Sequence, residues 1–212
     1  AIIGMNDMIL MSDADKEVKE YAGNVKSAGD TLLSIINDIL DFSRIESGRI
    51  ELVENTFSTV SMLNDVIMMT KGKAENKGLE LIIEADKELP SAFYADEVKI
   101  RQILTNVLGN AVKYTEKGSI GLVVKGSYVA DKYVLDVTVA DTGIGIKEEF
   151  KDKIFNKFER ADVMSSIEGT GLGLSITKKY LNIMGGTITG DSNYGVGSTF
   201  YISIPLKVED DT

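Results

Sequence analysis

Apolar residues at helical spacing dominate the first fifty positions of the chain. Residues 2–11 predict a short helix, and Ser12, with an acidic residue three places on, resembles a capping box that starts a second helix. The second helix alternates apolar steps of three and four, at Val18, Tyr21, Val25, Ala28, Leu32, Ile35, Ile39 and Phe42. This spacing is typical of a coiled-coil seam, and Gly48 predicts where the helix ends.

The apolar face of this predicted hairpin is wider than one partner helix would cover. Leu33, Ile36 and Leu40 extend it beyond the seam. One interpretation is that the hairpin packs on the rest of its own chain. A two-helix hairpin cannot by itself bury so wide a stripe, so we favour a homodimer in which two hairpins form a larger bundle.

The pattern changes at about residue 49. Strands are predicted at residues 50–53, 79–85, 92–94, 119–125, 133–140, 187–189 and 199–205. Helices are predicted at residues 58–77, closed by Gly78, from Asp96 as N-cap up to Tyr114, and after Leu172. The acidic residues 208–212 are predicted to lie outside the fold.

These elements predict an α+β class rather than a doubly wound sheet. Several strands read as antiparallel neighbours with helices on one side, which gives a two-layer sandwich with a mixed, mostly antiparallel sheet. We therefore predict two domains, a dimerising helical hairpin at residues 1–49 and an α+β domain at residues 50–212.

The composition excludes several kinds of chemistry. The chain is 43% hydrophobic and 26% charged and contains neither cysteine nor histidine, which removes thiol catalysis, histidine bases and histidine or thiolate metal sites. The net charge of −10 opposes nonspecific binding to nucleic acid. No apolar run approaches the roughly 20 residues of a membrane span. The absence of cysteine fits a reducing cytoplasm, where we expect the protein to work.

Three polar residues share one face of the helix that ends at Tyr114. Asn106, Asn110 and Lys113 are spaced by four and three, so they lie side by side next to the apolar face. The amides offer oxygen ligands to a hard cation and the ammonium offers a charge to phosphate. A solvated polar surface is the alternative interpretation of this helix taken alone.

Two later segments favour a nucleotide site. Asp141 follows a predicted strand and precedes Gly143 and Gly145, which let the backbone approach a flat ligand closely. The Asp141 carboxylate can then accept a hydrogen bond from an exocyclic amine of that ligand. The run from Gly169 to Gly173 precedes a helix, where exposed N–H groups attract phosphate. It matches neither a P-loop nor the dinucleotide pattern. The polar residues 160–167 before it are predicted to form a lid.

In this order, the segments resemble the catalytic ATP-binding domain of sensor histidine kinases, which has the Bergerat fold. The stretch Asn106-Val-Leu-Gly-Asn110-Ala-Val-Lys113-Tyr114 resembles the family's N box, and Asp141-Thr-Gly143-Ile-Gly145 its first glycine box. Residues 155–160 resemble the F box, residues 169–174 the second glycine box, and residues 195–200 the last glycine motif. The resemblance implies ATP and Mg²⁺ as cofactors.

The resemblance also implies a role for each matching residue. Asn110 would ligate Mg²⁺, and Asp141 would bond the adenine amine with support from Ser198. The residues implied in catalysis are Asn106, Lys113 and Arg160. Those implied in nucleotide binding are Asn106, Asn110, Lys113, Tyr114, Asp141, Gly143, Gly145, Phe158, Gly169, Thr170, Gly171, Leu172, Gly173 and Ser198.

The hairpin resembles the family's dimerisation and phosphotransfer domain, through residues 1–5 and 36–43. In that family the phosphoacceptor histidine lies shortly before the position of Ala1. We therefore expect this chain to bind ATP without phosphorylating itself, with a response-regulator receiver domain as partner and membrane attachment only through segments upstream.

Two alternatives remain open at this point. One is an ATPase of the same fold, of the gyrase, mismatch-repair or heat-shock chaperone type, although those use a glutamate base where this chain has Asn106. The other is a regulatory pseudokinase that holds nucleotide without transferring phosphate.

Overall fold

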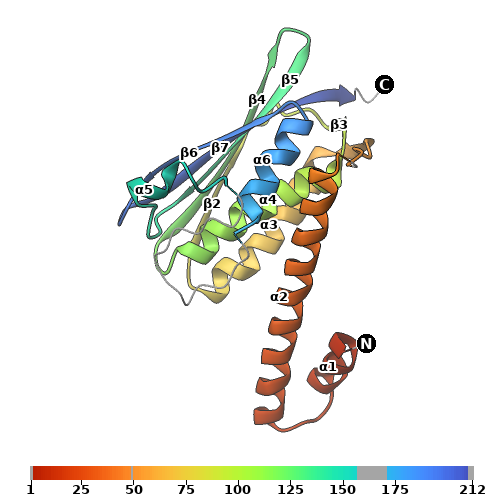
Figure 1. The fold of residues 1–212 in the computed structure, drawn as a ribbon, viewed down its shortest axis with the longest axis vertical. Coiled ribbons are helices and arrows are strands. Elements are labelled where there is room, and N and C mark those ends of the chain that lie inside the picture. The colour runs from red at the N-terminus through yellow and green to blue at the C-terminus, as the bar shows by residue number, and fades with distance from the viewer. Residues whose placement is uncertain (1, 49, 157–170, 210–212) are drawn as a thin grey trace. The chain divides into compact units, whose positions relative to one another are not determined.

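The computed structural model describes residues 2–48, 50–156 and 171–209 (Figure 1). Its contacts divide the chain into two compact units, residues 1–49 and 50–212. The first contains helices only, and the second combines helices with a sheet, so the predicted α+β class is confirmed. No helix of the described residues is long and apolar enough to cross a membrane.

The first unit is a helical hairpin of α1 (Ile2–Met11) and α2 (Lys16–Glu46). Two polar contacts hold its helices together. The buried Asn6 amide donates to the Ala22 carbonyl over 2.6 Å, and Lys26 pairs with Asp7 over 2.6 Å. Gly48 follows the end of α2 with a φ of 64°, as predicted.

The capping box predicted at Ser12 is wrong. The Ser12 hydroxyl donates to the Ile9 carbonyl over 2.7 Å, so it closes the last turn of α1. The residue at the N-cap of α2 is Asp15, and its side chain makes no capping hydrogen bond. A local Ser-to-carbonyl bond therefore prevails over the capping pattern that the sequence spacing suggested.

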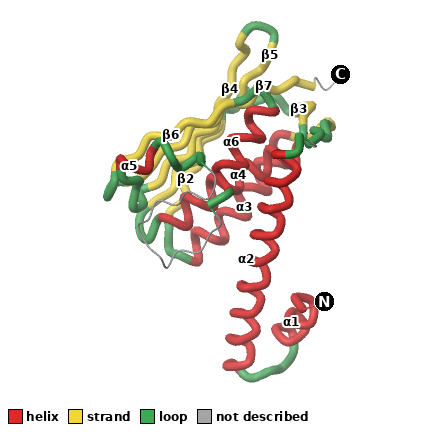
Figure 2. Tube along the Cα trace, in the orientation of Figure 1, coloured by secondary structure: helices red, strands yellow, loops and turns green. Residues whose placement is uncertain are grey.

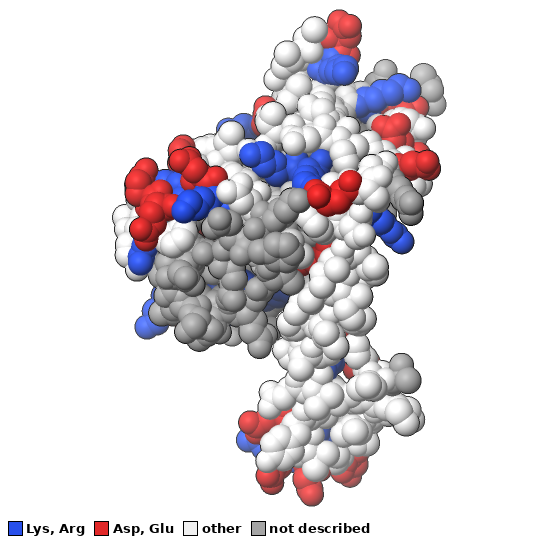
Figure 3. Space-filling model, in the orientation of Figure 1, with Lys and Arg blue, Asp and Glu red and all other residues white. Residues whose placement is uncertain are grey.

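The hairpin leaves a broad apolar surface uncovered within its own unit. Its exposed apolar side chains on α2 are Val18, Tyr21, Val25, Leu32, Leu33, Ile36, Ile39 and Leu40. In Figure 3 few charged side chains lie along the length of α2, whereas many gather at the end where α1 and α2 join. We call these eight residues the α2 apolar face.

The second unit is built on a seven-stranded sheet of the described residues, ordered β1-β3-β7-β5-β4-β2, with β6 paired to β7 (Figure 2). The strands are β1 (Asn55–Ser58), β2 (Glu80–Ala85), β3 (Ala92–Ala95), β4 (Ser119–Val129), β5 (Lys132–Asp141), β6 (Thr187–Asn193) and β7 (Gly197–Glu209). The β2–β4 pair is parallel and the other pairs are antiparallel, as the mixed sheet requires.

Helices cover one face of this sheet (Figure 1). They are α3 (Thr59–Asn76), α4 (Glu97–Tyr114) and α6 (Gly173–Ile183), and a short α5 (Glu148–Lys151) lies in the connection before α6. The alternate residues of β5 that face the helices, Tyr133, Leu135, Val137 and Val139, are buried. The two-layer sandwich predicted from the sequence is therefore confirmed.

Strands β4, β6 and β7 are longer than predicted, and two further predictions, a first strand at residues 50–53 and a tail from residue 208, are wrong. Residues 50–53 form no strand, because the Val53 N–H donates to the Asp96 carboxylate over 2.9 Å instead of joining the sheet, and the first strand is β1. The predicted loose tail begins too early, since Val208 and Glu209 pair with β3 at the end of β7. Both differences depend on partners that lie far away in the sequence.

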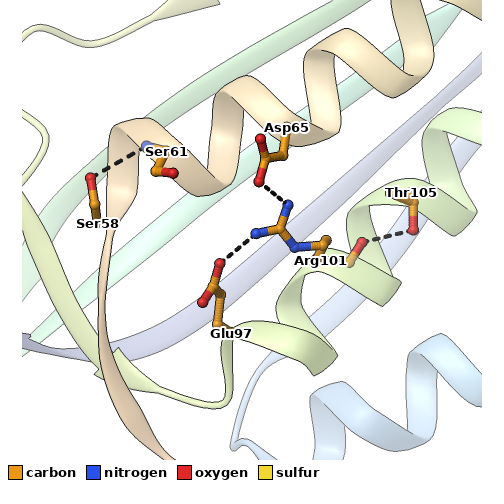
Figure 4. Close-up of polar contacts among 6 residues, drawn as sticks. All are labelled: Ser58, Ser61, Asp65, Glu97, Arg101 and Thr105. Carbon is orange, nitrogen blue, oxygen red and sulfur yellow. Dashed lines mark hydrogen bonds and ion pairs between the residues drawn. The ribbon is translucent and has the colours of Figure 1, made fainter.

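Helix α4 is fixed to its surroundings from its first turn. Asp96 is buried, and its carboxylate accepts the Lys99 N–H over 3.0 Å, as expected of an N-cap. Arg101 lies between Glu97 of its own helix and Asp65 of α3 (Figure 4), which it contacts over 2.7 Å. The hydrogen bond with Asp65 raises the pKa of Arg101 above its ordinary value.

Candidate functional site

Helix α4 carries four of the residues predicted to bind nucleotide. Its apolar side chains are buried under the sheet, at Ile100, Ile103, Leu104, Val107, Leu108, Ala111 and Val112. Asn106, Asn110 and Lys113 lie half-buried beside this face. The Lys113 ammonium lies 5.0 Å from the centre of the Tyr114 ring. The helix thus groups these polar side chains as the spacing predicted.

Asn106 joins α4 to the start of α6. Its amide nitrogen donates to the Thr177 hydroxyl over 2.8 Å. A Cβ added to Gly173 would lie 2.4 Å from the Asn106 amide oxygen, so a larger residue there would force the Asn106 side chain to move. Gly173 therefore has a packing role in addition to the phosphate role that its motif suggests, and Thr177 is a contributor that sequence reasoning missed.

Asp141 ends β5 with a half-buried carboxylate. Both of its hydrogen bonds reach the same oxygen, Oδ1, from the Gly143 N–H over 2.9 Å and the Ser198 N–H over 3.3 Å. No hydrogen bond within the described residues reaches its second oxygen, Oδ2. Burial raises the pKa of the Asp141 carboxyl above its ordinary value, and the two backbone bonds oppose this rise.

Close backbone approaches explain the glycines around Asp141. A Cβ on Gly143 would collide with the Tyr114 carbonyl, and the Ile144 N–H donates to that carbonyl over 3.1 Å. Gly145 has a φ of 65° and lies against the Asn193 backbone, where a Cβ would collide as well. The loop after Asp141 is thereby pressed against the end of α4, which brings two of the predicted motifs together.

A pair of buried serines supports the same loop from β6 and β7. The Ser192 and Ser198 hydroxyl oxygens lie 3.0 Å apart, and Ser192 also accepts the Ile146 N–H over 2.8 Å. Ser198 was predicted from the last glycine motif. Ser192 was missed, because only the register of β6 against β7 places it opposite Ser198.

Comparison with known proteins identifies this arrangement. The family described as "Histidine kinase-, DNA gyrase B-, and HSP90-like ATPase" matches residues 95–208, which include all of α4, Asp141 and Ser198. The family "His Kinase A (phospho-acceptor) domain" matches residues 1–48. The chain belongs to the histidine kinase family.

Individual histidine kinases resemble it over nearly its whole length. The signal transduction histidine-protein kinase BarA of Escherichia coli (strain K12) is 36% identical over 210 residues, which make up 98% of this chain and 23% of BarA. The crystal structure of full-length ShkA in complex with AMPPNP has a TM-score of 0.78 at 32% identity, covering 98% of this chain and 43% of that one.

A third relative is the histidine kinase ThkA, solved in complex with the response regulator protein TrrA. It has a TM-score of 0.65 at 27% identity and covers 96% of this chain and 56% of that one. The present chain therefore spans under a quarter of the length of BarA and about half of these two solved kinases.

Part of the predicted histidine kinase site lies outside the described residues. These positions are Phe158, Arg160, Gly169 and Thr170. The segment resumes at Gly171, whose φ is 69°, and Leu172, which is buried at the N-cap of α6. The Phe155 ring of the F box packs edge-on against Phe200 of β7, at 6.4 Å between ring centres.

Asn110, the residue predicted to ligate magnesium, is among the described residues, and its amide is half-buried. The described residues contain no group of three or more Asp, Glu, His or Cys that could hold a metal. Mg²⁺ usually takes only one or two protein oxygens and binds substrate phosphates and water besides, and an amide oxygen is a ligand of that kind.

Gly173→Ala tests the contact between α4 and α6. The added methyl group collides with Asn106, so we expect the free energy of unfolding to fall by about 1–3 kcal/mol, as for overpacking in a core. Gly109→Ala on α4 is the control, because nothing lies within 4 Å of its Cβ position. That variant should gain up to about 1 kcal/mol from helix propensity. Urea denaturation measures both, and equal effects would contradict the proposed contact.

Proposed function

We propose that this chain is the ATP-binding catalytic module of a two-component sensor histidine kinase. The observation that carries the proposal is the Asp141 carboxylate. A charge that is partly removed from water is costly unless hydrogen bonds compensate for it, and here two backbone N–H groups reach one oxygen of the half-buried Asp141 carboxylate. The second oxygen is an acceptor for the exocyclic amine of adenine, and Ser198 supports it from the neighbouring strand.

The phosphate end of the nucleotide lies along α4 and the start of α6 in this proposal. Asn110 ligates Mg²⁺, with Asn106 beside it, and Lys113 binds phosphate while Tyr114 lines the nucleotide. Asn106 supports this assignment because its bond to Thr177 fixes the distance between α4 and Gly173. In this proposal residues 160–167 are the lid, Gly169, Gly171 and Gly173 let it close over the phosphates, and Phe158 and Arg160 couple it to the rest of the domain. Gly143 and Gly145 let the backbone approach the base.

The acceptor of the phosphoryl group is proposed to be a histidine outside these 212 residues, because they contain none. The module acts as the donor half, in which the γ-phosphate of ATP moves to the histidine nitrogen and ADP leaves. A response-regulator aspartate then takes the phosphoryl group. Since ATP is the substrate, we place the module in the cytoplasm.

The partners follow from the hairpin. We propose a homodimer in which the α2 apolar face of one protomer packs against that of its partner. The exposed fractions of Leu32, Ile36 and Ile39 are 58%, 43% and 51%, so water contacts them in the isolated chain. ThkA binds its response regulator TrrA, and we propose a receiver domain of that class as the second partner.

A related ATPase is the competing function. ATP hydrolysis requires a base that activates water, and a neutral amide is a poor base. Asn106 occupies the position where those ATPases have a glutamate, and its amide is already bonded to Thr177. The geometry therefore favours a kinase over an ATPase.

Asp141→Asn tests the base pocket. The substitution keeps the shape but removes the charge that accepts the amine, so we expect the affinity for Mg–ATP to fall about 10- to 100-fold. Isothermal titration calorimetry with and without Mg²⁺ measures this change. Asp136→Asn, at an exposed position on the same strand, is the control. An unchanged affinity in the Asp141 variant would mean that adenine binds elsewhere.

Asp141→Asn also tests how the affinity for ATP and the stability of the fold depend on pH. The charged carboxylate binds adenine, so its contribution to affinity is lost as pH falls through the raised pKa of Asp141. Stability changes in the opposite direction. Because burial raises the pKa above the ordinary 3.8, this group's contribution to folding is fully present below that value and is lost as pH rises through the raised pKa. Both dependences should disappear in Asp141→Asn.

Leu32→Glu tests the homodimer. A charge placed on the α2 apolar face would have to be buried between protomers, so we expect the dissociation constant to rise at least about tenfold. Sedimentation equilibrium measures it. Ser34→Glu adds the same charge at another exposed position of α2 and should leave association unchanged. A chain that is monomeric at all concentrations before mutation would contradict the proposal.

Phosphotransfer decides between a kinase, an ATPase and a pseudokinase. The parent protein, with its acceptor histidine, is incubated with ATP labelled in the γ-phosphate. We expect acid-labile label on the protein and ATP turnover near background for the present chain alone. Sustained turnover by this chain would favour the ATPase, and binding of Mg–ATP without any labelling of the parent would favour the pseudokinase.

A further inference from the structure

The last turn of α4 leaves carbonyl groups that the helix itself cannot pair. In any α-helix the final four carbonyls lack an intrahelical partner, and here they belong to Ala111, Val112, Lys113 and Tyr114. The Ala111 carbonyl accepts from Thr115, through its N–H over 3.2 Å and its hydroxyl over 2.8 Å. The other three are paired by residues outside the helix.

One lysine pairs the Val112 and Lys113 carbonyls and also reaches the carbonyl of Thr115, which follows the helix. The Lys77 ammonium donates to the carbonyls of Val112, Lys113 and Thr115 over 2.8, 3.0 and 3.2 Å. Lys77 is the C-cap of α3, and Gly78 beside it has a φ of 68°, which turns the chain into β2. An ammonium has three donors and no acceptor, and its charge is favourable at a helix C-terminus.

The remaining carbonyl faces the base pocket. Tyr114 accepts the Ile144 N–H over 3.1 Å, and Gly143 lies against the same carbonyl. Gly143 in turn donates to Asp141. One helical turn therefore contacts both Lys77 and the Asp141 loop, and it also carries Lys113 and Tyr114.

We infer that Lys77 is a positioning residue for nucleotide binding. It fixes the last turn of α4, and through the bond from Ile144 to Tyr114 it fixes the Asp141 loop against that turn. Lys77 itself contacts no nucleotide in this arrangement. The inference rests on the proposed function, because it assigns to Lys77 the geometry of the site proposed above.

The chemistry of the contact requires lysine in particular. Three carbonyls from nearly successive residues converge on one nitrogen, which suits a compact ammonium. The guanidinium of arginine is a planar fork matched to carboxylate and phosphate, so it cannot direct its donors at the same point. Methionine retains the apolar length of the side chain and removes every donor.

Lys77→Met, Lys77→Arg and Lys71→Met together test the inference in the whole chain. Lys71 is the matched control, since it lies on the same helix and makes only an exposed 3.8 Å ion pair with Glu75. We expect Lys77→Met to weaken the binding of Mg–ATP about tenfold, the cost of roughly one lost charged hydrogen bond. Lys77→Arg should be intermediate and Lys71→Met within about twofold of the unmutated chain.

Adenosine separates a positioning role from a general loss of stability. It has no phosphate, so weaker binding of adenosine by Lys77→Met reports a change at the base pocket. Titrations are made well below the melting temperature of each variant. If Lys77→Met does not fold, Lys77→Gln, which retains a donor, takes its place. A lower melting temperature with affinities for both ligands within twofold of normal would overturn the inference.

A double-mutant cycle adds an independent measurement. If Lys77 acts through the Asp141 loop, the losses of affinity in Lys77→Met and Asp141→Asn should be less than additive. Full additivity would overturn the inference. Failure of the proposed function has a different signature, because it is read on the unmutated chain and its parent: no binding of Mg–ATP, sustained ATP turnover, or binding of Mg–ATP without labelling of the parent.

Discussion

Helix α4 is held by the pairing of the backbone groups that a helix leaves free at its ends, and the rest of the second unit is arranged around it. Asp96 caps its start and connects it to residue 53, while Lys77, Thr115 and Ile144 pair the carbonyls at its end. Three of these contacts, from Val53, Lys77 and Ile144, come from separate parts of the chain. Because buried backbone groups must be paired, each of those parts has one position relative to the helix.

The functional site follows from this constraint. The Asp141 loop lies at the C-terminal end of α4, and Gly173 lies beside Asn106 in its middle. Glycine is needed at both contacts, since a side chain would separate α4 from its neighbour. The family's glycine boxes thus have a packing function in this chain. The close approach of the loop after Asp141 to the end of α4 places the Asp141 carboxylate beside the helix that carries Asn110 and Lys113.

Sequence reasoning predicted most of the elements and erred where distant partners decide. The Asp96 cap and the glycines that end α2 and α3 act within a few residues, so their patterns were sufficient. The capping box predicted at Ser12 is absent because the Ser12 hydroxyl donates to the Ile9 carbonyl. The predicted strand at residues 50–53 failed because its backbone bonds to Asp96, more than forty residues away. Ser192, Thr177 and Lys77 stand in no motif and were missed.

The class of the fold, the order of the motifs and the family can be read from the amino acids alone, because periodicity, caps and spaced glycines are local chemistry. The same amino acids include the polar groups that a nucleotide needs. Which of these groups act together is visible only in the folded chain, where one oxygen of Asp141 accepts two backbone N–H groups, Asn106 bonds to α6, and Lys77 pairs the carbonyls at the end of α4. Those facts depend on strand register and helix packing, which bring together residues that the sequence keeps far apart.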